Sequence, residues 1–375
     1  MRVPLLDLTR QYRSLEADLQ AAVADVLRGG QFILGPNVKA LEAELAAYTG
    51  VDHAIGVANG SDALHLALLA AGIGPGDEVI CPAFTFFATA GAVARAGATP
   101  VFADIDPVSY TVPAHAMASR VTKRTKALLP VHLYGHPAAM GEIMRLARDH
   151  GLTVIEDAAQ AIGATVDGRR VAGIGHLGTY SFFPSKNLGA CGDGGMVTTH
   201  DPALAERVKL LRVHGAQPRY YHHLLGYNSR LDELQAAVIR IKLRHLDAWT
   251  AARRAAAGRY SRLIDEAGLQ DQVVCPTEAA SCQHVYHQYT IRAERRDALQ
   301  AHLERYGIGT AVYYPLPLHL QPVFKELGYQ PGDLHATELA CSQVLSLPIY
   351  PELTAEQQEY VVAQIRGFYA PGCGR

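Results

Sequence analysis

The sequence predicts an α/β protein in which a mostly parallel central sheet, flanked by helices, is followed by a smaller α+β unit. Between residues 53 and 200, short apolar runs alternate with helical stretches, which is the pattern of strand–helix–strand units. A long helical stretch from Leu231 to Ala267 comes next, and shorter strand and helix patterns follow it. Because 375 residues are enough for two structural units, we expect a large domain over residues 1–246 and a small one over residues 247–375.

The elements of the large domain can be followed in order along the chain. "HAIGVAN" predicts a strand that leads into a helix from Ser61 to Ala71, and "EVICP" predicts a strand followed by a helix through "TFFATAGAVARAG". The runs "TPVFADI", "KALLPVHLY" and "LTVIEDAA" predict three more strands, with a helix after Pro137 between the last two. Sheets of this kind bind ligands at the carboxyl ends of their strands. Residues that follow strands are therefore the first candidates for a site.

The smaller domain shows a different order of elements. Strands are predicted near residues 286–292 and 310–314, a helix near residues 296–306, and further helices toward the end of the chain. No internal repeat and no low-complexity linker separates this part from the rest. We therefore expect the two domains to pack against each other.

Composition argues against several functional classes. Hydrophobic residues make up 49% and charged residues 19% of the chain, and the formal net charge is −2, which is typical of a soluble globular protein. No basic block offers a surface for a phosphate backbone, so we do not expect a nucleic-acid partner. No run of about eighteen apolar residues occurs, and the first thirty residues lack the apolar centre of a signal peptide, so we expect a cytoplasmic protein without membrane contact.

One cluster of metal-type ligands occurs, in the segment "CQHVYHQYTIR". Its Cys282, His284 and His287 are residue types that bind zinc. However, Tyr289 and Ile291 continue an alternation typical of a strand, which would direct the two histidines to opposite faces. We therefore predict no metal site. The six cysteines include no CxxC pair, which indicates free thiols.

Four segments that follow predicted strands carry candidate site chemistry, and the first two are "ANGSDALHLAL" and "PAFTFFATA". In the first, Gly60, Ser61 and Asp62 open a helix, whose free N–H groups favour a phosphate, although an ordinary helix cap explains the same residues. In the second, an aromatic residue at the carboxyl end of a strand could stack on a flat ring. Phe84 and Phe87 could equally belong to the core.

The other two segments are "VIEDAAQAIGA" and "SFFPSKNLGACGDGG". Glu156 and Asp157 end an apolar strand, where a carboxylate needs a cation or hydrogen-bond donors. A structural salt bridge would satisfy this need, and so would a protonated ring nitrogen. Lys186 is the only lysine in a tight, glycine-rich and mostly uncharged segment. Burial would lower the pKa of such a lysine and make it a nucleophile toward an aldehyde.

The four segments together match one cofactor. A phosphate-binding helix start, a stacking aromatic residue, an acid for a pyridinium and a Schiff-base lysine are what pyridoxal phosphate requires. The acid would keep the ring nitrogen protonated, so that the ring could accept electrons from a carbanion at the α-carbon of an amino acid. The acid and the lysine follow separate strands in that order. The sequence therefore predicts a pyridoxal phosphate site.

These motifs resemble the DegT-type nucleotide-sugar aminotransferases, a branch of the fold-type I pyridoxal phosphate enzymes. The resemblance covers nearly the whole chain and is carried by "GQFILGPNVKALEAELAAYTG", "NGSDAL", "GDEVICPAFTFFATA", "VIEDAAQAIGA", "SFFPSKNLGACGDGGMVTT", "GYNSRLDELQAAVIRIKL" and "YYPLPLHLQP". It implies the fold of that class, a pyridoxal phosphate cofactor and transfer of an amino group. Some relatives that deoxygenate sugars carry a histidine at the position of Lys186, so the lysine favours transamination here.

The resemblance implies roles by position. Lys186 would bind the aldehyde of the cofactor, Asp157 would face the pyridine nitrogen, and Gln160 would lie near the phenolic oxygen of the ring. Phe86 would stack on the ring. The phosphate cup would comprise Gly60, Ser61, Asp62 and Ser181; Asn228 would reach the cofactor phosphate of the neighbouring subunit; and contacts with the sugar nucleotide would involve Arg230, Tyr313, Tyr314 and His319. The role of Asn228 implies a homodimer with shared active sites.

The resemblance also implies the substrates. L-Glutamate would donate the amino group, and a keto-hexose linked to UDP or dTDP would accept it, as in amino-sugar and polysaccharide biosynthesis. The segment "RYYHHLLGYNSRLDELQAA" resembles the branch that aminates position 3 of the sugar rather than position 4. Amination at position 4 and a non-catalytic regulatory protein that binds pyridoxal phosphate on the same fold stay open as alternatives. A desulfuration that uses Cys191 is a further alternative, but no mobile loop is evident around that cysteine.

Overall fold

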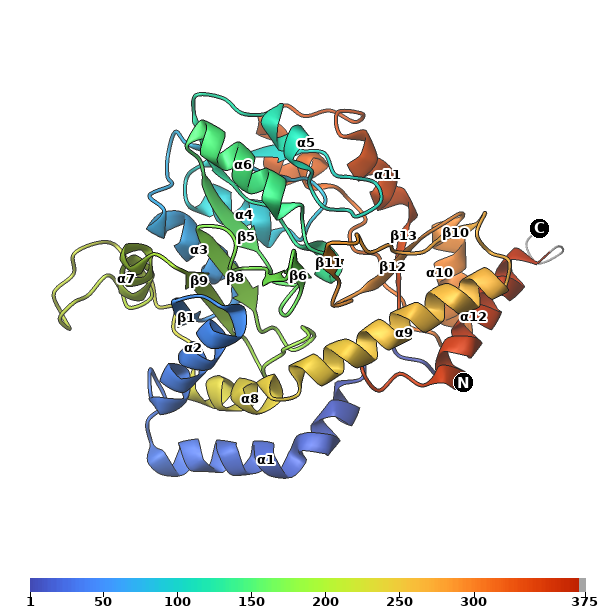
Figure 1. Cartoon of the computed structure of the whole chain (residues 1–375), viewed down its shortest axis with the longest axis horizontal. Coiled ribbons are helices and arrows are strands. Elements are labelled where there is room, and N and C mark those ends of the chain that lie inside the picture. Colours follow the sequence, from blue (N-terminus) through green and yellow to red (C-terminus); the bar gives the residue numbers. More distant parts are fainter. Residues whose placement is uncertain (371–375) are drawn as a thin grey trace.

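The computed structural model describes residues 1–370, and its centre is a seven-stranded sheet (Figure 1). The strand order is β1-β9-β8-β5-β4-β2-β3. Strands β3, β2, β4, β5 and β8 are parallel, whereas β9 pairs antiparallel with both β8 and β1. The prediction of a mostly parallel central sheet is confirmed. Its strands are β1 (His53–Val57), β2 (Glu78–Pro82), β3 (Thr99–Ala103), β4 (Thr125–Leu128), β5 (Thr153–Asp157), β8 (Leu177–Ser181) and β9 (Gly195–Thr199).

Helices cover both faces of this sheet, and strand residues alternate between two cores. On one face, α3, α4 and α7 pack over a core that includes Ile155; on the other face, α5 and α6 pack over a core that includes Val154. Burial on both faces explains why the strands read as apolar runs. The helices of residues 1–243 are α1 (Leu8–Gly29), α2 (Pro36–Thr49), α3 (Gly60–Ala70), α4 (Ala88–Arg95), α5 (Ala114–Ala118), α6 (Met140–His150), α7 (Pro202–Leu211) and α8 (Glu233–Leu243), with the 3-10 turn η1 (Leu133–Gly135).

A second, antiparallel sheet in the order β10-β12-β13 lies at the right of Figure 1. It packs with α9, α10 and α12 around a core of its own, which includes Tyr289 and also Val3 from the first residues of the chain. Leu318 and Phe324, by contrast, join the core of the large sheet. The boundary between residues 246 and 247 therefore stays a prediction. The elements are β10 (Val273–Val274), β12 (Tyr289–Ala293), β13 (Val344–Leu347), α9 (Leu246–Glu266), α10 (Arg296–Arg305), η2 (Leu318–Leu320), η3 (Pro322–Leu327), α11 (His335–Gln343) and α12 (Ala355–Tyr369).

A third, small sheet joins distant parts of the chain in the order β11-β6-β7. Strand β11 (Cys282–Gln283) pairs antiparallel with β6 (Thr165–Val166), which in turn pairs with β7 (Arg169–Arg170). The C-terminal part of the chain is thereby bonded to the loop that follows β5. Within residues 1–370, no helix has both the length and the apolar composition needed to cross a membrane.

The structure differs from the sequence prediction in two regular elements. The helix predicted over Leu231–Ala267 is two helices, α8 and α9, with a break at residues 244–245. The chain turns there because α8 packs on α1 and α2, whereas α9 packs on α12. The strand predicted near residues 310–314 forms only one bridge, between Ala311 and Ser346.

The segment that contains Cys282 also departs from the predicted strand. It is interrupted after Gln283, because Tyr286 adopts a left-handed backbone conformation with φ of 44°. The ring of His284 stacks on that of Tyr286 with centroids 3.9 Å apart, whereas His287 contacts a different side chain, described below. The two histidines diverge through an irregular loop rather than through strand alternation. Within residues 1–370, no group of three metal-ligating side chains is brought together.

Candidate active site

A cavity of about 460 Å³ lies at the carboxyl-terminal edge of the large sheet. Its walls come from residues that end or follow β1, β2, β4, β5 and β8, where the strand pattern predicted a site. Most of the predicted site residues line this one cavity, although they come from five separate segments of the chain. They are Gly60, Ser61, Phe86, Asp157, Gln160, Ser181, Lys186, Tyr313 and Tyr314.

Two predicted residues of the same region lie outside the cavity wall. Asp62 stands in the first turn of α3, and its carboxylate faces Arg95 at 3.5 Å. His319 is buried, and its Nε2 lies 3.1 Å from Oε1 of Glu338. The predicted contact of His319 with a sugar nucleotide therefore has no counterpart in the cavity of this chain, and its role stays a prediction.

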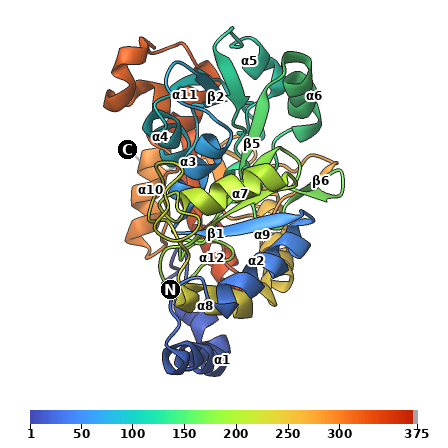
Figure 2. The ribbon, with the colours of Figure 1, turned by 90° about the vertical axis from the view of Figure 1, so that its left-hand side faces the viewer.

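Asn228 and Arg230 lie in the segment between α7 and α8, which projects at the left of Figure 1 and faces the viewer in Figure 2. Arg230 donates a hydrogen bond of 2.5 Å to Oδ1 of Asn228. Tyr220, Tyr221 and Leu225 of this segment are 75%, 68% and 95% exposed. These residues do not line the cavity of their own chain.

The start of α3 forms one end of the cavity. Asn59 caps this helix, because its Oδ1 accepts a hydrogen bond of 2.8 Å from the backbone N–H of Asp62. The N–H groups of Gly60 and Ser61 have no partner in the part of the chain that the structure describes. A Cβ on Gly60 would lie 2.6 Å from the Cβ of Ser181, so the helix start and the Ser181 hydroxyl converge. Free N–H donors at a helix start together with a hydroxyl suit a phosphate.

Glu156, the first of the two acids at the end of β5, belongs to the framework. Its Oε1 accepts hydrogen bonds from the N–H groups of Ile174 and Gly175, and its Oε2 from Ala172 and from Nε2 of His132, all between 2.6 and 3.0 Å. Burial by itself would raise the pKa of Glu156, but these hydrogen bonds and the His132 ring hold it below the usual value. The structural alternative considered for this acid pair therefore applies to Glu156.

Asp157, the second acid, points into the cavity and has fewer partners. Its Oδ2 accepts a hydrogen bond of 2.8 Å from the hydroxyl of Thr89, and its Oδ1 one of 3.1 Å from the N–H of Ala159. Burial raises the pKa of Asp157, and these bonds, together with the charge of Lys186, offset only part of that effect. A buried carboxylate of this kind would be stabilised by a further cation.

Lys186 lines the same cavity from a tight loop that follows β8. Its N–H donates to the carbonyl of Phe183 at 2.8 Å, and a Cβ on Gly189 would lie 2.2 Å from the carbonyl oxygen of Pro184, so the loop requires that glycine. Burial lowers the pKa of Lys186 to about 8, while the charge of Asp157 opposes the change. The shift is in the direction that the sequence predicts.

Three aromatic residues after β2 have three different environments. Phe84 is buried in the core, and Phe87 stacks on Phe324 with ring centroids 5.8 Å apart. Phe86 is 55% exposed and lines the cavity, with its ring centroid 6.0 Å from that of Tyr314. Phe86 is therefore the one of the three that presents an exposed ring to the cavity.

Gln160 is oriented by a residue that the sequence reasoning missed. The backbone N–H of Tyr134 donates to Oε1 of Gln160 at 2.7 Å, and Nε2 of Gln160 donates to the hydroxyl of Tyr314 at 3.1 Å. The amide NH₂ is thereby turned toward the cavity. Tyr134 has a left-handed φ of 58°, and its hydroxyl donates to the carbonyl of Tyr313. No pattern around Tyr134 in the sequence singles it out.

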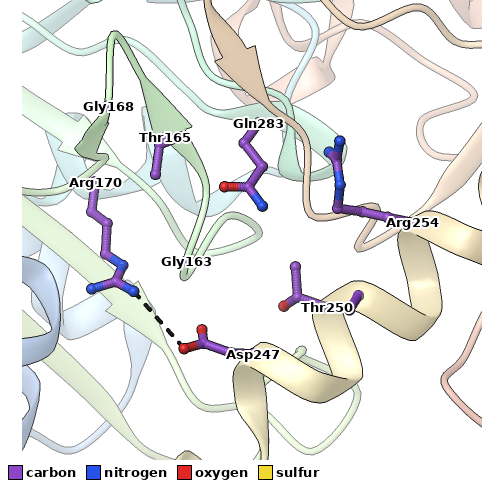
Figure 3. Close-up of a pocket in the computed structure, with 9 residues that line it drawn as sticks. Gly163, Thr165, Gly168, Arg170, Asp247, Thr250, Arg254 and Gln283 are labelled. Atoms are coloured by element: carbon purple, nitrogen blue, oxygen red, sulfur yellow. Dashed lines mark ion pairs between the residues drawn. The ribbon is translucent and has the colours of Figure 1, made fainter.

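A larger hollow of about 670 Å³ lies between the β6–β7 hairpin and α9 (Figure 3). It contains none of the predicted site residues. Arg170 donates to the carbonyl of Tyr48 and lies 4.0 Å from Asp247, and Arg254 donates to Glu278 at 2.7 Å. Because both guanidinium groups have partners within the protein, this hollow presents no uncompensated charge. The cavity at the sheet edge remains the candidate active site.

The sequence pattern of the DegT/DnrJ/EryC1/StrS aminotransferase family matches residues 13–366 of the chain. The chain belongs to this family. The resemblance inferred from the motifs is therefore confirmed, and so is the prediction that the protein is an enzyme of the aminotransferase class.

Individual relatives within the DegT/DnrJ/EryC1/StrS family match over almost the full length. A pleiotropic regulatory protein of Geobacillus stearothermophilus is 58% identical over 98% of this chain and 99% of its own. A UDP-N-acetyl-3-dehydro-alpha-D-glucosamine 3-aminotransferase of Acidithiobacillus ferrooxidans is 48% identical over 97% of both chains. The crystal structure of DesV from S. venezuelae in complex with a ketimine intermediate has a TM-score of 0.95, with 47% identity and 98% of both chains covered. The predicted fold class is thereby confirmed.

Proposed function

We propose that this aminotransferase uses pyridoxal phosphate to move an amino group from L-glutamate to position 3 of a keto-hexose linked to UDP or dTDP. The observation that carries the proposal is the single cavity in which Lys186, Asp157 and the free start of α3 meet. The names of two relatives support the position on the sugar. One is the 3-aminotransferase of A. ferrooxidans, and the other is a dTDP-3-amino-3,4,6-trideoxy-alpha-D-glucose transaminase of Streptomyces venezuelae, 48% identical over 97% of this chain and 96% of its own.

The residues present fit pyridoxal phosphate. The N–H groups of Gly60 and Ser61 with the hydroxyl of Ser181 would hold its phosphate, and the exposed side chain of Phe86 would cover its ring. Asp157 has the raised pKa of a buried acid without a full cationic partner, so a protonated ring nitrogen would complete it. When bound, this group supplies an aldehyde that reacts with amines and a ring that accepts electrons.

Three side chains of the cavity would have separate roles in the transfer of the amino group. With a pKa of about 8, roughly one Lys186 amine in ten is neutral at pH 7, so Nζ can act as a nucleophile and then carry the proton of the donor's α-carbon. The carboxylate of Asp157 would stabilise a proton on the ring nitrogen of the cofactor. The NH₂ of Gln160, whose amide is oriented by Tyr134, would donate to the phenolic oxygen of the cofactor.

A homodimer is part of the proposal. Large apolar side chains that are exposed on a projecting segment mark interaction surfaces, and Tyr220, Tyr221 and Leu225 are such side chains. In a two-fold dimer, this segment of each chain would be buried against the other chain. Asn228, at the base of the segment, would then complete the phosphate site of the partner subunit.

A regulatory protein is the second candidate function. The 58% identical relative from G. stearothermophilus is named for regulation rather than for catalysis. The amine of Lys186 with its lowered pKa, set opposite a buried acid, favours catalysis, because a protein that merely binds a cofactor needs no nucleophile.

One experiment separates these possibilities. The protein loaded with pyridoxal phosphate is incubated with L-glutamate and a panel of UDP- and dTDP-linked hexoses that carry a keto group at position 3 or at position 4, and product masses are measured. We expect amino sugars from 3-keto substrates, and 2-oxoglutarate in equal amount. Lys186→Ala is the control that should give none. Products from 4-keto sugars alone would contradict the assigned position, and no product from any sugar, with the cofactor bound, would favour the regulatory alternative.

A further inference from the structure

His287 lines the same cavity as Lys186, and its ring is held in one orientation. Nδ2 of Asn187 donates to the carbonyl of Val285 at 3.1 Å, which turns the amide oxygen of Asn187 toward Nδ1 of His287 at 3.2 Å. An amide oxygen only accepts hydrogen bonds, so the proton of the ring is on Nδ1. Val285, Asn187 and His287 are buried.

The imidazole of His287 is neutral, and its Nε2 therefore carries a lone pair. Burial holds the pKa of His287 well below the usual value, and the charges of Lys186, Arg253 and His284 act in the same direction. Within residues 1–370, no side chain or backbone group makes a hydrogen bond with Nε2 of His287. The atom is nevertheless accessible to solvent, and we infer that it faces the cavity that His287 lines. An acceptor in such a place is stabilised by a donor.

We propose that His287 is a positioning residue whose Nε2 accepts a hydrogen bond from the amine of Lys186 whenever that amine is free. The inference rests on the proposed role of Lys186. Lys186 and Asn187 are consecutive, so the side chain that orients the imidazole is attached to the backbone that carries the amine. Both residues also belong to the loop that Gly189 keeps tight against Pro184.

A neutral acceptor suits an amine that must gain and lose protons. Asp157 is the group that favours the charged form of Lys186. A second carboxylate in the place of His287 would favour the ammonium further and reduce the share of nucleophilic amine. A neutral imidazole nitrogen also orients the amine of Lys186, but it lowers the fraction of neutral amine less than a carboxylate would, because it carries no net charge.

Two variants test the proposed role of His287, because each retains only one of the two hydrogen bonds assigned to its ring. His287→Asn retains a donor near the position of Nδ1 and removes the acceptor at Nε2, whereas His287→Gln places an amide oxygen near Nε2 and loses the bond to Asn187. The full-length chain, freed of cofactor, is reductively methylated at a series of pH values. The modification of Lys186 is followed by mass spectrometry, with the exposed Lys123 as the internal control.

We expect the midpoint of Lys186 methylation to fall by about one pH unit in His287→Asn, a tenfold change in the protonation equilibrium, and to stay at the wild-type value in His287→Gln. Equal shifts in both variants, or an unchanged or raised midpoint in His287→Asn, would overturn the proposal. If only His287→Gln folds, a fall in its midpoint overturns the proposal and an unchanged midpoint supports it. Because no cofactor or sugar is present, this result does not depend on the outcome of the substrate panel.

Discussion

Replacing Gly60 by alanine tests the phosphate end of the cavity. The added Cβ would lie 2.6 Å from the Cβ, 2.9 Å from the Oγ and 3.1 Å from the Cα of Ser181, whereas carbon atoms in contact prefer about 3.5–4.0 Å. The start of α3 and the end of β8 must then separate by about 1 Å. Because a misplacement of about 1 Å can cost about 100-fold in a preorganised site, we expect the affinity for pyridoxal phosphate to fall about 10- to 100-fold.

The assay for Gly60→Ala compares two ligands in the cofactor-free protein. Dissociation constants are measured by absorbance titration for pyridoxal phosphate and for pyridoxal, which lacks the phosphate. The loss should appear only with the phosphorylated ligand. Gly258→Ala is the matched control, since nothing lies within 4 Å of a Cβ on that glycine in α9, and it should leave both constants unchanged. Unchanged affinity of Gly60→Ala for pyridoxal phosphate, or equal losses for both ligands, would refute the reasoning.

Four further predictions concern the acids, the lysine and the dimer. Asp157→Asn should slow the half-reaction with glutamate by about 100-fold or more with little change in thermal stability; a lower melting temperature at a near-normal rate would show a structural role instead. Glu156→Gln should lower stability rather than the rate, because Glu156 bonds to backbone N–H groups of the surrounding loop. The free energy of unfolding should fall by about 1–3 kcal/mol in urea titration. A slowed half-reaction with glutamate in a protein of unchanged stability would contradict this structural role of Glu156. Lys186, whose pKa is lowered to about 8, should be methylated increasingly as pH rises through about 8, since the neutral amine reacts; a midpoint near the ordinary lysine value of about 10.4 would contradict its burial. Mixing inactive Lys186→Ala with weakened Asn228→Ala should restore activity after subunit exchange, because one site of each mixed dimer then has neither defect; proven exchange without recovery would place both residues in the same chain's site.

The large sheet could be predicted because its signals are local. Apolar runs bounded by turn residues indicated each strand, and burial on both faces made these runs nearly continuous. The break between α8 and α9 could not be predicted, since helical periodicity continues through it and only the different packing partners separate the two helices. Long-range packing, rather than local preference, decides that boundary.

The candidate site divides in the same way. Asp157 ends a strand, Lys186 follows one, and both break the local pattern of their surroundings, so the sequence singles them out. The sequence does not single out Tyr134, and it points to His287 only as a possible metal ligand, because what these two residues do depends on residues far along the chain. Tyr134 orients Gln160, which lies 26 residues later, and His287 contacts Asn187, which lies 100 residues earlier. Such pairings follow from the folded arrangement alone.

The adjacency of Glu156 and Asp157 has a consequence for how this protein tolerates change. Successive residues of a strand point to opposite faces, and β5 is fixed beside β8 with Glu156 opposite Gly178 and Asp157 opposite Thr179. Inserting or deleting one residue within β5 would exchange the two carboxylates, leaving one without its framework donors and the other away from the cavity. We therefore expect libraries of single-residue insertions and deletions to contain no active variant with a change within β5.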